Sequence, residues 1–135
     1  MIGLDTNILA RYILDDDPHW SQRVSQFLET QLSVQKPGYI NPITLVELVW
    51  ILRRKPGYNR TKLAAIVDGL LSSDVLVVGE AAAVEQALAS FKVGSAGFAD
   101  YLIAELNEAA GASPTITLDH RASKNPPFVL FSQEA

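Results

Sequence analysis

The sequence predicts an α/β fold in which a central, mostly parallel sheet carries helices on both faces, giving three α/β/α layers. Short β-type runs alternate with longer runs of helical periodicity along the whole chain. Residues 75–78 form a continuous apolar run rich in Val, which is typical of a parallel strand covered on both faces. The chain has 135 residues, a length that suits one compact domain, and we expect a single domain over residues 1–135.

The first predicted helices follow a short apolar strand at residues 2–4. The polar side chains of the next three residues can cap a helix over residues 8–14. An acidic turn then leads to Pro18, which we expect in the first turn of a second helix. The apolar face of this second helix comprises Trp20, Val24, Phe27, Leu28 and Leu32.

The middle of the chain predicts a strand at residues 39–41 and then the most apolar helix of the sequence, residues 42–54. Because this helix is apolar nearly all round, we expect it to be buried on most sides or to offer a face to a partner. A fourth helix at residues 61–71 and the strand at residues 75–78 follow.

The second half of the chain predicts two helices followed by two strands. Gly111 ends the second of these helices. We expect the last strand to lie at an edge of the sheet. The helices cover residues 80–91 and 99–110, with a loop at 93–97 between them, and the strands cover residues 115–118 and 128–131.

Net charge limits the classes of function. A formal charge of −4 and a pI near 5.0 argue against a protein that mainly coats nucleic acid. A nuclease still fits, because carboxylates in a metal site count as negative until the ion binds. Any contact with RNA would depend on a local basic group, and the same group can be interpreted as a solvated helix end. This group comprises Arg53, Arg54, Lys55, Arg60 and Lys62.

The sequence contains no cysteine and no pattern that predicts a targeting signal. No apolar run reaches the roughly 18 residues that span a bilayer. Asp5 interrupts the apolar N-terminal stretch, so we expect no signal peptide. The absence of cysteine excludes disulfides and zinc binding through thiolates. We therefore expect a cytoplasmic protein without membrane association.

Four acidic residues stand at the edges of apolar segments: Asp5, Glu47, Asp100 and Asp119. A carboxylate among apolar residues normally has a partner. Four carboxylates at one site would repel one another unless a cation held them together. Hard oxygen ligands suit Mg²⁺ or Mn²⁺, ions that activate water and stabilise phosphoryl oxygens. The four residues therefore predict a metal-dependent enzyme that acts on phosphodiesters.

Position in the predicted sheet favours this interpretation over the structural alternatives. Asp5 and Asp119 follow strands, and ligand sites of parallel sheets lie outside the carboxyl ends of the strands. Asp5 can instead cap a helix, and Asp119 can be a plain turn residue. Asp100 can complement a helix dipole, and Glu47 can pair with an arginine. Only the joint occurrence of the four residues favours a common site.

Four motifs in this order resemble the PIN-domain family, and most closely the VapC-type toxins of prokaryotic type II toxin–antitoxin systems. They are Leu-Asp-Thr-Asn at 4–7, Leu-Val-Glu-Leu-Val-Trp at 45–50, Phe-Ala-Asp-Tyr-Leu-Ile-Ala at 98–104 and Thr-Leu-Asp at 117–119. The resemblance covers nearly the whole chain, from Met1 to about Phe131.

The resemblance implies a Mg²⁺- or Mn²⁺-dependent endoribonuclease that hydrolyses RNA with metal-activated water. Asp5 and Asp100 would hold the metal, supported by Glu47 and Asp119. Neighbouring polar residues would hydrogen-bond the carboxylates or position water, namely Thr6, Asn7 and Thr117. At Gly97 this chain departs from many relatives, which carry a further Asp there.

The resemblance also implies partners. VapC-type toxins usually form homodimers and are neutralised by a small antitoxin protein that lies across the active-site groove. The apolar helices at 20–32 and 43–54 are candidate surfaces for such contacts.

Other interpretations remain open at this level. A PIN-like fold can serve as a catalytically silent binding or regulatory module, or as a housekeeping nuclease without an antitoxin. A response-regulator receiver domain would need paired acidic residues after the first strand and a lysine after a late strand. Asp5 has no adjacent acidic residue, and Lys124 lies beyond Asp119 in a Pro-rich tail.

Overall fold

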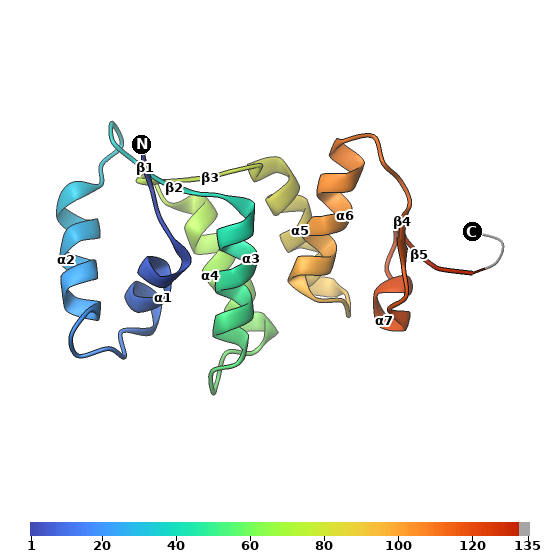
Figure 1. Ribbon diagram of the computed structural model, residues 1–135, viewed down its shortest axis with the longest axis horizontal. Helices are drawn as coiled ribbons and strands as arrows, with labels where there is room; N and C mark the ends of the chain where they lie inside the picture. The colour runs from blue at the N-terminus through green and yellow to red at the C-terminus, as the bar shows by residue number, and fades with distance from the viewer. Residues whose placement is uncertain (133–135) are drawn as a thin grey trace. The chain divides into compact units, whose positions relative to one another are not determined.

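The computed structural model describes residues 1–132 and divides into two compact units. The first unit is Met1–Glu80, and the second begins at Ala81. Each unit is described by itself below (Figure 1).

Unit 1 contains a three-stranded parallel sheet and four helices (Figure 1). The strand order is β1-β2-β3, with Ile2 paired to Gly38 and Gly38 paired to Leu76. Both crossovers contain helices, as parallel pairing requires. The elements are β1 (Ile2–Gly3), α1 (Thr6–Leu14), α2 (Ser21–Gln31), β2 (Gly38–Ile40), α3 (Pro42–Arg53), α4 (Arg60–Ser72) and β3 (Leu76–Val78).

Side-chain caps begin three of the four helices of unit 1. The Asp5 carboxylate accepts a hydrogen bond from the N–H of Thr6 at the start of α1. Asn41 caps α3 and accepts from the N–H of Thr44 at 2.9 Å. Asn59 caps α4 in the same way. Each cap satisfies a backbone donor that the helix itself leaves without a partner.

The predicted start of the second helix is wrong by three residues. Pro18 lies in a turn, and α2 begins at Ser21. The reason is Asp17, whose carboxylate accepts from the N–H groups of His19 and Trp20 and so holds a turn before the helix.

Two further expectations about exposure are wrong. Trp20 and Phe27 are 49% and 42% exposed, so the buried apolar residues of α2 are Val24 and Leu28, with Leu32 just beyond the helix. Val77 in β3 is 39% exposed, so the strand is not covered on both faces. The main core of unit 1 instead lies under α1, α3 and α4, where the fully buried side chains include Leu9, Ile40, Leu45, Leu48, Leu52 and Val67.

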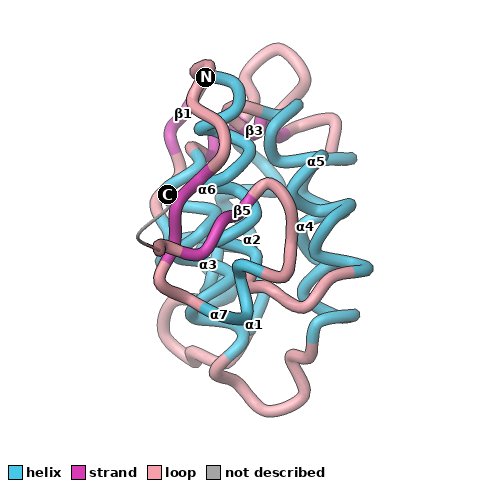
Figure 2. The backbone as a smooth tube through the Cα atoms, turned by 90° about the vertical axis from the view of Figure 1, so that its right-hand side faces the viewer, coloured by secondary structure: helices cyan, strands magenta, loops and turns pink. Residues whose placement is uncertain are grey.

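Unit 2 contains two long helices and a pair of parallel strands. The strands pair Thr115 with Phe128 and Thr117 with Leu130. The short helix α7 lies beside this pair in the connection between its strands (Figure 2). The sequence did not predict this helix. The elements are α5 (Ala81–Val93), α6 (Phe98–Ala109), β4 (Thr115–Thr117), α7 (His120–Ser123) and β5 (Phe128–Leu130).

The helices α5 and α6 pack side by side in unit 2 (Figure 1). Their contact includes an edge-to-face pair between the rings of Phe91 and Phe98, with centroids 5.8 Å apart. Ala104, Ala122 and Phe128 form a small buried cluster that joins α6, α7 and β5. Within residues 1–132, no helix is long and apolar enough to cross a membrane. The predicted α/β class with parallel strands is confirmed.

Candidate functional site

Two of the four predicted carboxylates lie in unit 1 and are linked through Thr6. Asp5 follows β1 and accepts from the N–H of Thr6 through Oδ1 at 2.7 Å. The buried Thr6 hydroxyl donates to Oε1 of Glu47 at 2.8 Å. One residue therefore bonds both carboxylates, through its backbone for Asp5 and its side chain for Glu47. Asn7 is exposed in the first turn of α1.

Glu47 lies on the exposed side of α3 although its helix is the most apolar in the chain. Its neighbours Leu48 and Val49 are buried, so the helix directs its apolar side inward and Glu47 outward. The arginine ion pair considered for Glu47 is not observed within residues 1–132, where its hydrogen-bond partner is the Thr6 hydroxyl.

Asp100 lies in the first turn of α6 in unit 2. Its Oδ2 accepts from the N–H of Gly97, the residue that precedes the helix, at 3.1 Å. This is the side-chain half of a capping box, and glycine can provide no reciprocal bond. The carboxylate is half-buried and is fixed close to the helix N-terminus, where a negative charge is stabilised.

Asp119 follows β4 and begins α7. Its Oδ1 accepts from the N–H groups of Arg121 and Ala122, at 2.8 and 3.2 Å. The N–H of Asp119 in turn donates to the hydroxyl of Thr117 at 3.0 Å. The exposed carboxylate is thus held by the helix that it caps and by the strand before it.

A hydrogen-bond network in unit 2 connects the surroundings of Asp100 and Asp119. Asn125, just after α7, accepts from the hydroxyl of Tyr101 at 2.7 Å and donates to the carbonyl of Arg121 and the hydroxyl of Ser95. The Tyr101 hydroxyl also accepts from the buried N–H of Ala96. This network fixes the loop before α6 to the end of α7. Sequence reasoning missed Asn125 and Tyr101, because no local pattern links residues 24 positions apart.

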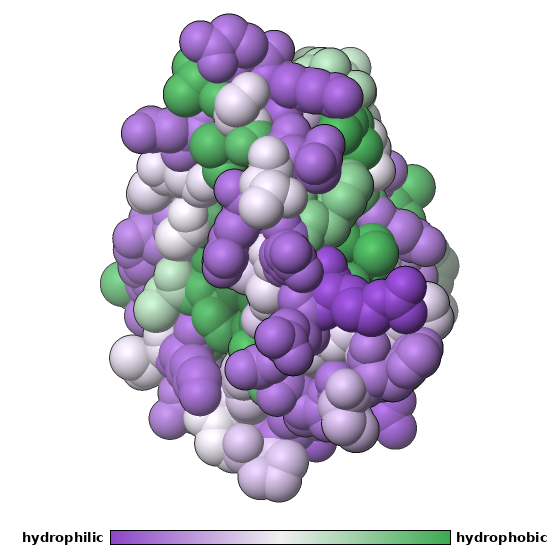
Figure 3. All heavy atoms as spheres, turned by 90° about the vertical axis from the view of Figure 1, so that its left-hand side faces the viewer, coloured by the Kyte–Doolittle hydropathy of each residue, from purple (hydrophilic) through white to green (hydrophobic). Residues whose placement is uncertain are grey.

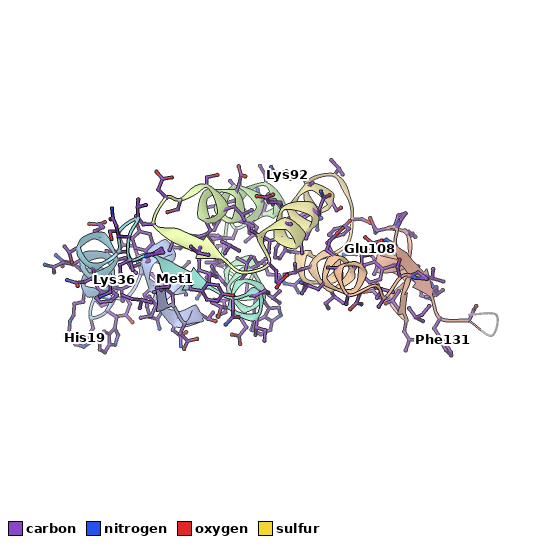
Figure 4. All side chains as sticks on the ribbon, turned by 90° about the horizontal axis from the view of Figure 1, so that it is seen from above. Met1, His19, Lys36, Lys92, Glu108 and Phe131 are labelled. Atoms are coloured by element: carbon purple, nitrogen blue, oxygen red, sulfur yellow. The ribbon has the colours of Figure 1, made fainter. Side chains whose placement is uncertain are left out.

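The histidines do not join these acidic residues. His19 lies on the turn before α2 (Figure 4), with its ring edge-on to Trp20. His120 is exposed in α7.

Each unit contributes two of the four acidic residues. Among the residues that the structure describes, no group of three or more His, Cys, Asp or Glu side chains is placed to hold a metal ion. A group of three from this set requires residues of both units, and the convergence of all four carboxylates stays a prediction.

In a comparison with family models, residues 2–126 of the chain match the PIN domain. This chain belongs to the PIN domain family. The match crosses from unit 1 into unit 2 and includes Asp5, Glu47, Asp100 and Asp119. A PIN domain is consistent with the predicted three-layer α/β/α fold, and PIN domains are generally nucleases. No curated protein matches the chain.

Proposed function

We propose that this PIN domain is a divalent-metal-dependent endoribonuclease whose catalytic residues are Asp5, Glu47, Asp100 and Asp119. The observation that carries the proposal is a family match that extends over both units and contains all four acidic residues. Asp5 and Asp119 each follow a parallel strand, where ligand sites of α/β sheets lie.

The chemistry of the four side chains fits Mg²⁺ or Mn²⁺. All ligands offered are hard carboxylate oxygens, and Asp5, Glu47 and Asp119 are exposed, so a cation can reach them. We assign the metal to Asp5 and Asp100, with support from Glu47 and Asp119. When bound, the ion would supply Lewis-acid stabilisation of phosphoryl oxygens and lower the pKa of a water molecule.

The protein's own contribution is to hold these carboxylates in place. The Thr6 hydroxyl fixes the orientation of Glu47, and the N–H of Thr6 fixes Asp5. Backbone N–H groups at the starts of α6 and α7 donate hydrogen bonds to the Asp100 and Asp119 carboxylates and fix their direction. Such bonds restrict the rotation of ligands and so limit the reorganisation that substrate binding requires.

We further propose that the enzyme is the toxin of a cytoplasmic type II toxin–antitoxin pair and that it forms a homodimer. A cavity of about 450 Å³ between α1, α2, α4 and β3 supports a protein partner. Most of its lining is apolar, including Leu9, Leu28, Leu32, Ile66 and Leu70. Figure 3 shows the face of the molecule on the α2 side, where hydrophobic residues lie between hydrophilic ones.

Cleavage of a total RNA pool tests the nuclease proposal. We expect discrete products with Mg²⁺ or Mn²⁺, none with EDTA, and none from the Asp5→Asn or Asp100→Asn variants. Asp68→Asn and Glu85→Gln are matched controls, because each removes one exposed carboxylate from another helix of the same unit. Cleavage by a folded Asp5→Asn variant at the wild-type rate would refute the assignment.

Coexpression tests the toxin proposal separately. We expect expression of the wild-type chain to stop growth and the Asp5→Asn variant to permit it. A small protein encoded beside this chain should restore growth and copurify. A charged substitution at an exposed residue of the cavity lining, Tyr12→Glu, should break copurification, whereas Glu29→Gln in the same lining should not. Harmless expression of an active nuclease would contradict the toxin assignment.

A further inference from the structure

Positive charge is concentrated at one end of α3 and in the turn that leads to α4. Five of the chain's 11 lysine and arginine residues fall between positions 53 and 62, and no acidic residue stands between Glu47 and Asp68. The chain as a whole has a net charge of −4, so this region opposes the general charge. We call it the α3–α4 surface, comprising Trp50, Arg53, Arg54, Lys55, Tyr58, Arg60 and Lys62.

Two aromatic rings in the α3–α4 surface carry cations on their faces. The guanidinium of Arg54 lies 4.6 Å from the centroid of the Trp50 ring, and the ammonium of Lys62 lies 4.1 Å from that of Tyr58. Trp50 is 52% exposed, so a face of its ring is accessible to a ligand. Cations stacked on aromatic rings are the combination that binds bases and phosphates of single strands.

The α3–α4 surface is continuous with Glu47 along one side of α3. Glu47, Trp50 and Arg54 occur at spacings of three and four residues, which places them on one stripe of the helix. All three are exposed. At a rise of about 1.5 Å per residue, the stripe extends about 10 Å from Glu47 to Arg54. A strand held at the carboxylates would therefore reach Trp50 and Arg54 within two helical turns.

We propose that the α3–α4 surface binds a single-stranded segment of RNA next to the phosphate to be cleaved, with a base on Trp50 and phosphates on Arg54 and Lys62. The assignment rests on the proposed nuclease function and adds a surface that would hold the substrate beside the site. A single strand fits better than a duplex, because the exposed ring face can stack only on an unpaired or splayed base.

Fluorescence anisotropy of a labelled single-stranded RNA of about 16 nucleotides, a length at the upper end of known site sizes, measures this binding in EDTA. We expect Trp50→Ala to weaken binding by about 5- to 100-fold, and Trp50→Phe to retain most of it. Arg54→Gln and Lys62→Gln should each lower the slope of log affinity against log salt concentration by about 0.7.

The matched control is Trp20→Ala. Trp20, just before α2, is 49% exposed and has the guanidinium of Arg23 at 4.9 Å, so it offers a similar ring and cation outside the α3–α4 surface. It should bind RNA as the wild type does. Equal losses in the Trp20 and Trp50 variants, or equal binding of duplex and single-stranded RNA, would overturn the proposal.

Oligomeric state separates RNA binding from self-association. If Trp50→Ala binds RNA normally but converts a dimer to a monomer in light scattering, the α3–α4 surface is an interface between copies and the proposal falls. Cleavage lost in Asp5→Asn, with RNA binding unaffected in Trp50→Ala, would remove this inference and leave the nuclease proposal standing. If Trp50→Ala loses RNA binding but the wild type cleaves no RNA, the surface binds RNA and the nuclease proposal falls.

Discussion

Removal of the Thr6 hydroxyl should lower activity more than it lowers stability. Thr6 is only 6% exposed, and its hydroxyl donates to Glu47 over 2.8 Å. Hydrogen bonds to charged groups contribute about 1.5–3 kcal/mol, but Glu47 is exposed and water can replace the donor, so we expect Thr6→Val to lose about 1 kcal/mol. For a chain of this size, that loss lowers the Tm by about 4 °C. Because Glu47 then rotates freely, we expect RNA cleavage to slow by about 10- to 100-fold.

Thr6→Ser provides the matched comparison. Serine keeps the hydroxyl and loses one buried methyl group, which costs about 0.8 kcal/mol. The two variants should therefore have similar melting temperatures by circular dichroism, while only Thr6→Val loses activity under saturating Mg²⁺. Equal activity of the two variants, or a wild-type rate for Thr6→Val, would refute the positioning role of the hydroxyl.

Three further predictions concern stability. Tyr101→Phe should lower the free energy of unfolding by about 1–3 kcal/mol, because the buried N–H of Ala96 loses its acceptor; an unchanged urea midpoint would contradict this. Burial, and then the charge of Glu108, raise the pKa of Glu105 above its ordinary 4.5. The native state therefore binds this proton more tightly than the unfolded state does, and stability falls as pH rises from 4.5 through the raised pKa. Glu105→Gln should remove this fall and stabilise the protein at neutral pH by a few tenths of a kcal/mol, as melting temperatures at acid and neutral pH will show. Hydrogen bonds from two backbone N–H groups lower the pKa of Asp17 below its ordinary 3.8, so its contribution is present above that value and is lost as pH falls through the lowered pKa. In the Asp17→Asn variant, the melting temperature should fall less steeply as pH is lowered in the acid range. An unchanged fall would exclude Asp17 as its cause.

Much of the fold could be predicted from local signals. Asp5 and Asn41 stand directly before helices and cap them, and Gly111, with a φ of 84°, follows the end of α6. The β-branched and apolar runs before Asp119 and Glu80 do form strands. These elements were predictable because the residues that stop or start them act on the neighbouring backbone alone.

Elements that depend on competing local bonds were not predictable in the same way. Pro18 is acceptable in the first turn of a helix, but the two hydrogen bonds of Asp17 hold it in the preceding turn. The short helix α7 has only four residues and no apolar period. Its one sequence signal is Asp119, which sequence reasoning treated as a turn residue or a ligand and not as a cap.

The candidate site shows why helix capping and metal binding are poor alternatives for an aspartate. Sequence reasoning set capping against metal binding for Asp5 and did not consider a cap for Asp119, and the structure shows that both residues cap helices. Each does so through Oδ1, and a carboxylate has two oxygens with about four lone-pair directions between them. Capping therefore uses part of the side chain's hydrogen-bonding capacity and fixes its direction, and it leaves lone pairs free for a metal ion. It follows that replacing Asp5 by Asn, which still accepts the bond from Thr6, should preserve α1 and remove only the charge. Replacing Asp5 by Ala should destabilise the helix start by about 1 kcal/mol as well. If both variants melt at the wild-type temperature, the cap contributes nothing to stability. The fixed direction of the Asp5 carboxylate must then have another cause.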